Sequence, residues 1–369
     1  MAYDRTKPYN DLPLLPPKSI AEDIDIFKKL VTASRALAGI NMNVLRLPNP
    51  HMLINTIALQ EAKSSTEIEN IFTTEDELYR AVSDSIQEAQ ANQSTKEVLR
   101  YREALWEGYG QIQQAQKINL KGIISIFRQI KNSTGGIRPA HTLTVIQRGQ
   151  SEFRSGEIIY TPPRGEGVID NLMKNLIDYM NNDKKYPTDP LIKMCIAHYQ
   201  FEAIHPFPDG NGRTGRVLNL LYLVNKGLLE MPVLYLSKYI ITHKEDYYYN
   251  LGLVTQRGSW KKWILFMLEA VEKTSELTNH LINSILNQME ATLETGRKHI
   301  KWYSKEVNEL IFTQPYIKPK ALGDLLSISS RTTLTKYFNE LVDAKILTSL
   351  KDGREVFYVN EELVQILEG

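Results

Sequence analysis

Apolar residues recur three and four positions apart along most of the chain, which predicts a mainly helical protein. Pro50 precedes one of these periodic segments, and Glu69 lies at its end. The predicted helices cover 21–38, 51–69, 75–87, 96–108, 120–131 and about 260–298.

Two parts of the chain depart from this pattern. Residues 1–20 carry four prolines, so we expect an extended arm over the surface rather than a helix. Residues 142–146 and 157–163 alternate apolar and polar side chains between glycines and prolines, which predicts short strands or a hairpin. An ordinary surface hairpin is one interpretation of these two segments.

The residues from His205 to Arg216 read HPFPDGNGRTGR and lie between two segments predicted to be core helices. Before them, the sequence Thr-Asp-Pro at 188–190 is typical of a helix start, with a capping side chain and then proline. After them, residues 217–224 are too apolar for a surface segment and predict a buried helix. The sequence therefore predicts a tight loop that opens onto the N-terminus of the second helix.

The side chains of this loop are suited to phosphate-ester transfer. Free amides at a helix N-terminus, with glycines that allow close approach, form an anion site. Arg213 and Arg216 are three apart, so both can contact one bound anion. Asp209 offers an oxygen ligand to a divalent ion, and His205, with an ordinary pKa of about 6.5, suits a base that takes a proton from a hydroxyl. A histidine before a proline, or Asp-Gly-Asn-Gly alone, is a common turn sequence. Their combination with two arginines at the start of a buried helix favours phosphate-ester transfer.

Composition narrows the class of protein. The chain has 369 residues, 42% of them hydrophobic, which is enough for two or three globular domains. A net charge of +1 favours neither nucleic acid nor an anionic membrane as a partner. The single cysteine excludes an internal disulfide and fits a reducing compartment. With no signal-like or membrane-spanning segment in the sequence, we expect a cytoplasmic protein.

Residues 205–216 resemble the motif of the Fic family, His-x-Phe-x-Asp/Glu-Gly-Asn-Gly-Arg-x-x-Arg, at every fixed position. The resemblance extends over most of residues 1–290. It implies a Fic-type helical bundle with a hairpin flap, and an enzyme that moves AMP from ATP to a Ser, Thr or Tyr hydroxyl of a protein and releases diphosphate. A kinase-like branch of the family has lysine at the position of Gly212, so this glycine favours AMP transfer.

The resemblance also implies roles for individual residues. His205 would be the base, Asp209 the Mg²⁺ ligand and Asn211 a contact to the α-phosphate. The residues that would cradle the phosphates of ATP are Gly210, Gly212, Arg213 and Arg216. By the same resemblance, residues 142–163 correspond to the flap that binds the target's backbone as an added strand, through Ile158, Ile159 and Tyr160. The candidates for a wall against the adenine are Tyr247 and Leu251.

Residues 65–70, Ser-Thr-Glu-Ile-Glu-Asn, resemble the inhibitory pattern that some family members carry N-terminal to the catalytic core. This resemblance places an inhibitory helix at about 51–70 and makes Glu69 its inhibitory residue. A carboxylate beside the arginines of a phosphate site would compete with phosphate for them. The alternative is an ordinary helix end with Asn70 as its left-handed cap.

The C-terminal region, 300–369, is predicted to contain three helices followed by a hairpin at 346–359. That order resembles a winged helix-turn-helix domain, a fold that suits DNA binding. From Lys301 onward, however, nine Lys and Arg residues face ten Asp and Glu residues. Since DNA affinity depends mainly on phosphate neutralisation, we favour a packing or docking role over DNA binding.

Three regions are therefore expected: an N-terminal arm and helices at 1–110, a catalytic core at 111–290 and the C-terminal domain at 300–369. The leading hypothesis is a protein adenylyltransferase that uses ATP and Mg²⁺ and is restrained by Glu69. Two alternatives are removal of AMP from a modified protein and a nucleotide-sensing DNA-binding regulator. Self-modification, a homodimer and the identity of the target protein are left open by the sequence.

Overall fold

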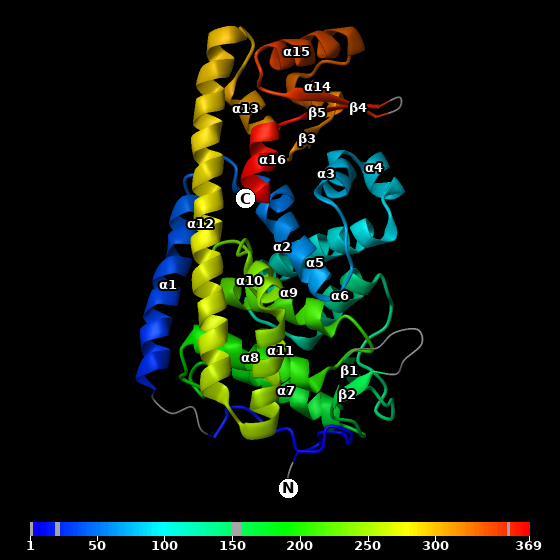
Figure 1. Ribbon diagram of the computed structural model, residues 1–369, viewed down its shortest axis with the longest axis vertical. Helices are drawn as coiled ribbons and strands as arrows, with labels where there is room; N and C mark the ends of the chain where they lie inside the picture. Colours follow the sequence, from blue (N-terminus) through cyan, green and yellow to red (C-terminus); the bar gives the residue numbers. More distant parts are fainter. Residues whose placement is uncertain (1–2, 19–22, 149–155, 353–354) are drawn as a thin grey trace. The chain divides into compact units, whose positions relative to one another are not determined.

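The computed structural model describes residues 3–18, 23–148, 156–352 and 355–369, and the fold is mainly helical (Figure 1). Contacts divide the chain into two compact units, each built from separate stretches of sequence. The first unit comprises Met1–Ala38, Arg100–Pro232 and Leu236–Thr274. The second unit comprises Gly39–Leu99, Val233–Tyr235 and Ser275–Gly369. The three regions expected from the sequence follow the chain rather than contacts, so their boundaries stay a prediction.

The core of the first unit is formed by helices α8 (Pro190–Ile204) and α9 (Asn211–Asn225), which are buried on nearly all sides. Helix α7 (Val168–Asn181) packs against α8, and α6 (Leu120–Lys131) packs against α9. Asp189 caps α8 by accepting a hydrogen bond from the backbone N–H of Leu191, as the sequence predicts. Around them lie α10 (Leu236–Thr242), α11 (Lys244–Arg257) and parts of α1 (Ile24–Val44), α5 (Gln93–Ala115) and α12 (Trp260–His299).

The described part of the N-terminal arm, residues 3–18, has no regular secondary structure, as predicted, and it is anchored to the core helices. Leu12 and Leu15 are buried. The side-chain amide of Asn175 on α7 pairs with both backbone polar groups of Leu15, at 2.8 and 3.1 Å. Gln200 on α8 donates to the carbonyl of Pro13 at 2.9 Å. The arm is therefore held against α7 and α8.

A short hairpin follows α6, as the sequence predicts. Strands β1 (Ile146–Arg148) and β2 (Glu157–Tyr160) pair antiparallel, with Ile146 opposite Tyr160 and an irregularity after Ile146. The predicted strand at 142–146 is wrong except for its last residue, because 142–145 have no regular structure. The residues between the strands, 149–155, lie outside the described part of the chain.

The second unit contains α2 (Ile57–Ile68), α3 (Glu75–Ser83), α4 (Ser85–Gln90) and the C-terminal domain. Two predicted helices are interrupted here. The segment at 51–69 begins as a 3₁₀ helix, Pro50–Asn55, and 75–87 breaks at Asp84, whose carboxylate caps α4 by accepting from the N–H groups of Ile86 and Gln87. Side-chain capping of this kind competes with continuation of a helix.

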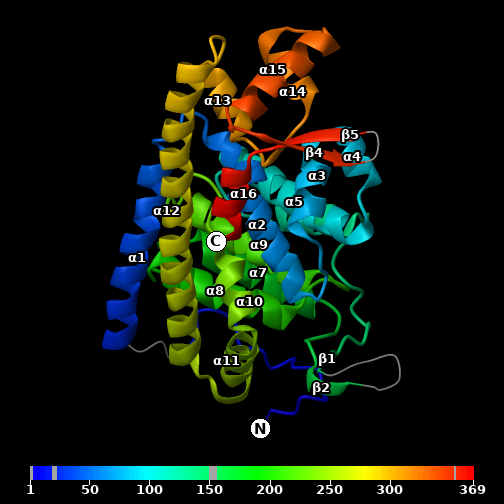
Figure 2. The ribbon, with the colours of Figure 1, turned by 45° about the horizontal axis from the view of Figure 1, so that its top comes forward.

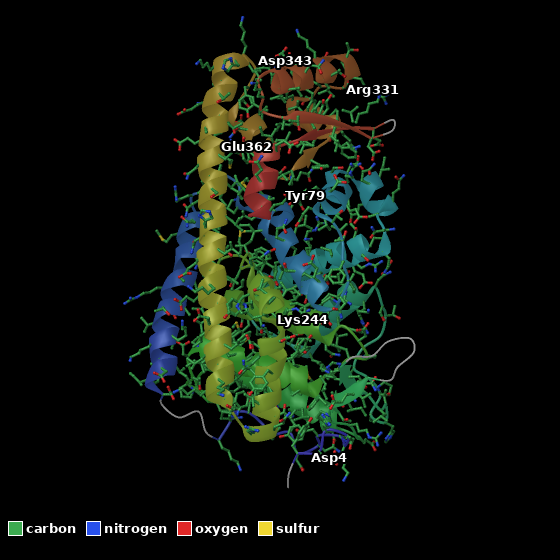
Figure 3. All side chains as sticks on the ribbon, in the orientation of Figure 1. Asp4, Tyr79, Lys244, Arg331, Asp343 and Glu362 are labelled. Carbon is green, nitrogen blue, oxygen red and sulfur yellow. The ribbon has the colours of Figure 1, made fainter. Side chains whose placement is uncertain are left out.

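The C-terminal domain has the predicted order of elements, three helices followed by a hairpin, and a final helix. Figure 3 labels Arg331 and Asp343 at the two ends of its third helix. A short strand after the first helix joins the hairpin, so that the sheet has the order β3-β5-β4. The elements are α13 (Lys305–Ile311), β3 (Tyr316–Ile317), α14 (Pro319–Leu326), α15 (Arg331–Asp343), β4 (Thr348–Asp352), β5 (Glu355–Val359) and α16 (Glu361–Glu368). Residues 353–354, in the predicted turn, lie outside the described residues, and the winged-helix assignment stays a prediction.

The sheet of the C-terminal domain packs on α3 and α4 (Figure 2). Tyr316 on β3 donates to Asp76 at 2.7 Å. Arg80 on α3 lies 5.2 Å from the centre of the Phe357 ring on β5 and forms an ion pair with Asp352 on β4. Charged and aromatic contacts therefore connect this sheet to the helices that follow α2.

Helix α2 is joined to α3 by a second group of polar contacts. The amide of Gln60, which is 2% exposed, donates to Tyr79 at 2.9 Å and to Glu75 at 3.1 Å. Lys63 pairs with Glu75 at 2.9 Å. Tyr79, labelled in Figure 3, also packs its ring 5.8 Å from that of Tyr316. Tyr79 thus contacts both α2 and the C-terminal sheet.

No helix among the described residues is long and apolar enough to cross a membrane.

We expect Tyr79→Phe to lower the free energy of unfolding of the second unit by about 1–2 kcal/mol, because a buried amide loses an acceptor. Tyr316→Phe should lower this free energy by less than about 1 kcal/mol, because water can replace the lost hydroxyl as a hydrogen-bond donor to Asp76. The Asp76 side chain is 49% exposed. Hydrogen exchange of the α3 amides in urea measures both losses. Equal losses would contradict the distinction between a buried and a solvated hydrogen bond.

Candidate active site

The loop predicted to carry the chemistry runs from the end of α8 to the start of α9. His205 ends α8 in the left-handed conformation, with φ 51° and ψ 59°, and its N–H donates to the carbonyl of Phe201 at 3.0 Å. Few residues other than glycine adopt this conformation, although histidine is among those enriched in it. The half-buried imidazole is therefore placed by a backbone that the surroundings must hold.

Arg138 and Tyr160 hold that backbone through four successive carbonyl groups. The hydroxyl of Tyr160 donates to Ala203 at 2.7 Å. The guanidinium of Arg138 donates to His205 at 2.8 Å and to Ile204 at 3.4 Å, and its backbone N–H donates to Pro206 at 2.9 Å. The sequence gives no signal for Arg138, which lies between the predicted helix at 120–131 and the predicted strands.

The inner part of the loop is closed by Asn211. Its side chain accepts a hydrogen bond from the N–H of Phe207 and donates one to the carbonyl of Phe207, both at 2.8 Å. The ring of Phe207 stacks on Phe127 of α6, with centroids 4.1 Å apart. Asn211 thus has a structural role in the loop, while its predicted contact to an α-phosphate stays a prediction.

The start of α9 has the features of an anion site. Gly210 caps the helix with φ 76°, so no side chain covers the first amides. Arg213 and Arg216 lie in the first two turns and are 2% and 1% exposed. The positive charge of Arg216 acts on the imidazole of His198 on α8. Burial, together with that charge, lowers the pKa of His198 to about 3.

Asp209 lies at the outer edge of the loop with its side chain 70% exposed. Its carboxylate pairs with Lys131, the last residue of α6, at 2.5 Å, a contact that the sequence did not reveal. Burial works to raise the pKa of Asp209, but the hydrogen bond and charge of Lys131 outweigh it and hold that pKa below its usual range. Asp209 is therefore an ionised carboxylate that already has a cation beside it.

The donor set fits Mg²⁺ bound together with a nucleotide. Within the described ranges no group of three or more His, Cys, Asp or Glu side chains could hold a metal by itself. Mg²⁺ on a polyphosphate usually takes one or two carboxylates and keeps several waters. Asp209 is accessible and ionised, so it could supply such a ligand.

The other predicted site residues lie in varied surroundings. Tyr247 is 1% exposed, bonded to His198 at 2.8 Å and packed on Trp263, so its placement gives no support to an adenine contact. Leu251 is half-buried on the same helix, α11. Ile158 and Ile159 are half-buried on β2.

Glu69 lies at the end of α2, where both interpretations of residues 65–70 place it. It is half-buried at the C-cap position, and Asn70 follows in the left-handed conformation with φ 61°. The helix end expected from the sequence is confirmed, whereas the pairing of Glu69 with Arg216 stays a prediction.

The loop between two buried helices, with a histidine at one end and paired arginines at the other, defines a Fic-type domain. The sequence matches the Fic/DOC family N-terminal region over residues 27–110 and the Fic/DOC family over 94–223. Residues 287–363 match the C-terminal domain of SoFic-like protein adenylyltransferases. The chain belongs to the Fic/DOC family.

Curated relatives include the protein adenylyltransferase Fic of Drosophila willistoni, 28% identical over 53% of this chain and 36% of that protein. A probable protein adenylyltransferase of Aquifex aeolicus is 42% identical over 44% of this chain and 47% of its own length. The chain therefore matches less than half the length of these relatives.

Solved structures show the same fold. A Fic family protein from Desulfovibrio desulfuricans aligns over 94% of this chain and 98% of its own, with TM-score 0.56 and 17% identity. Fic-1 from Caenorhabditis elegans aligns over 70% of this chain and 74% of its own, with TM-score 0.51 and 18% identity.

We expect Gly210→Ala to lower the free energy of unfolding by about 1–2 kcal/mol, since alanine is strained at positive φ, and also to weaken ATP binding. A Cβ there would lie 3.0 Å from the Lys131 side chain, beside the amides of α9. Gly167→Ala is the matched control, because Gly167 also has φ 70° at a helix start but has open space around it. Urea unfolding and ATP titration measure the two effects. Equal ATP affinity in both variants would argue against an anion site at this loop.

Proposed function

We propose that this chain transfers AMP from ATP to a hydroxyl group of a protein. The observation that carries the proposal is the six-residue connection 205–210, which has a histidine at one end and an uncovered helix N-terminus with two buried arginines at the other. A general base and an anion site are thereby separated by one short loop. The names of the relatives, which are protein adenylyltransferases, support the same reaction.

In this reaction the acceptor oxygen forms a bond to the α-phosphorus of ATP, and the bond between that phosphorus and the oxygen leading to the β-phosphate breaks. His205 takes the proton of the hydroxyl, and diphosphate leaves. Arg213, Arg216 and the first amides of α9 hold the phosphates in place. Mg²⁺, held by Asp209 and phosphate oxygens, would neutralise part of the charge on the leaving diphosphate.

The hairpin β1–β2 is the proposed binding element for the protein target. A target segment added to a strand binds through its main chain, so many sequences can bind while the hydroxyl is kept in register. Tyr160 ties β2 to the carbonyl of Ala203, two residues before His205. This tether supports a hairpin that positions the acceptor relative to the base.

We expect His205→Asn to reduce AMP transfer by about 10²–10⁴-fold, the usual cost of losing a general base, with ATP binding largely retained. Asparagine tolerates the left-handed backbone at this position better than alanine does. The measurement is incorporation of label from α-³²P-ATP into protein from a lysate, beside a binding titration with ATP. Near-normal labelling would remove His205 from catalysis, and label from γ-³²P-ATP instead would indicate transfer of a phosphate group.

The proposal includes inhibition by Glu69. Its carboxylate would compete with the γ-phosphate of ATP for Arg216, so that ATP binds poorly or with a misaligned α-phosphate. The half-buried position of Glu69 at the C-cap of α2 supports this role. The resemblance of residues 65–70 to the family's inhibitory pattern, together with the complete motif at 205–216, supports it as well.

We expect Glu69→Gly and Glu69→Gln to raise AMP transfer by roughly 30- to 700-fold, if the blocked state is favoured by about 2–4 kcal/mol. Arg216→Ala should not be activated, because it loses a phosphate contact together with the block. The Gln variant keeps the size of the side chain and so controls for flexibility at the helix end. Labelling from α-³²P-ATP is compared for all four proteins. Equal labelling by wild type and both Glu69 variants would contradict inhibition, and weaker labelling would favour a role of Glu69 in catalysis, as in removal of AMP.

A further inference from the structure

The end of α8 has an unusual arrangement of hydrogen bonds. The last carbonyl groups of a helix have no partners within the helix, and they usually bond to water or to a cap. Here four consecutive carbonyls, from Ala203 to Pro206, accept hydrogen bonds from protein groups instead. Three of the four bonds come from Arg138, which is 2% exposed.

We infer that Arg138 is a positioning residue that holds the backbone of His205, and with it the imidazole, in the orientation needed for proton transfer. This inference rests on the proposed function. Arg138 does not bond to the imidazole, so it acts through the main chain. Its contact to the His205 carbonyl, at 2.8 Å, is the shortest of its bonds to the end of α8.

The chemistry of arginine explains why this residue type can hold the end of α8. A guanidinium is a planar group with five N–H donors in fixed directions, so one side chain can bond to several carbonyls at once. A positive charge is also favourable beside the negative end of a helix dipole. Lysine would keep the charge but would place all its donors on one atom.

Arg138 also joins the end of α8 to the segment that follows the flap. The same guanidinium donates to the carbonyl of Pro163 at 2.5 Å, three residues after the end of β2. The residue that holds His205 therefore also holds the base of the hairpin proposed to bind the target. Loss of Arg138 would affect the relative placement of base and acceptor more than the anion site, which is formed by α9.

The test uses Arg138→Met and Arg138→Lys, with Arg164→Met as the matched control. Arg164 is the residue directly after Pro163. Its backbone N–H donates to the side chain of Asn10 at 2.9 Å, and the substitution leaves this bond in place. We expect both Arg138 variants to lower kcat about 100-fold, since a displacement of about 1 Å can cost that much, while KM for ATP changes less than about threefold. Arg164→Met should keep the kcat of wild type.

A second measurement does not depend on activity. The protein has seven histidines, and the ¹³C–¹H imidazole signal of His205 is assigned by its loss in His205→Asn. We expect this signal to shift or broaden in the Arg138 variants and to be unchanged in Arg164→Met. In Arg138→Ala, added guanidinium should restore the signal and recover about tenfold in kcat, because it can refill the space and the hydrogen bonds.

The outcomes separate the inference from the proposed function. An unchanged kcat and an unchanged His205 signal in the Arg138 variants would overturn the inference. So would a loss of kcat that follows lost thermal stability and that added guanidinium does not restore in Arg138→Ala. If wild type transfers no AMP, the proposed function fails, and the His205 signal still tests whether Arg138 holds that residue in place.

Discussion

The site depends on how α8 is brought to an end at His205. A buried helix that stops abruptly leaves carbonyl groups that must find donors, and a left-handed residue at the end must be held by its neighbours. The guanidinium of Arg138 and the hydroxyl of Tyr160 meet both needs. Because burial raises the pKa of Tyr160 well above its ordinary value, this phenol stays a neutral donor. The loop that follows can then be short, and only six residues, 205–210, separate α8 from α9.

The second constraint is electrostatic. Two arginines lie almost fully buried in the first turns of α9, where they add to the positive end of the helix. His198, close to Arg216, is kept neutral by burial and by that charge, and it serves as a hydrogen-bond partner of Tyr247. The positive groups of the proposed anion site are therefore held in place by packing.

The second unit connects the segment of Glu69 with the C-terminal domain by direct contacts. Gln60 and Lys63 on α2 bond to α3, and Tyr79 on α3 packs against Tyr316 of the C-terminal sheet. Tyr316 in turn donates to Asp76. These contacts give the sheet a packing role within its unit, and they place α3 in contact with both α2 and the sheet.

The sequence by itself determined the features that depend on neighbouring residues. Helical spacing, the capping at Asp189, the short hairpin and the loop of residues 205–216 between two core helices were all predictable, since each is written within one or two turns of chain. Local signals also failed where side chains compete with the helix, as at Asp84. Only the tertiary structure brought Arg138 to His205, Lys131 to Asp209 and Tyr160 to Ala203, because these partners are 67, 78 and 43 positions apart and no periodic pattern links them. The candidate reaction residues could therefore be proposed from the sequence, whereas the groups that hold them in place were decided by packing.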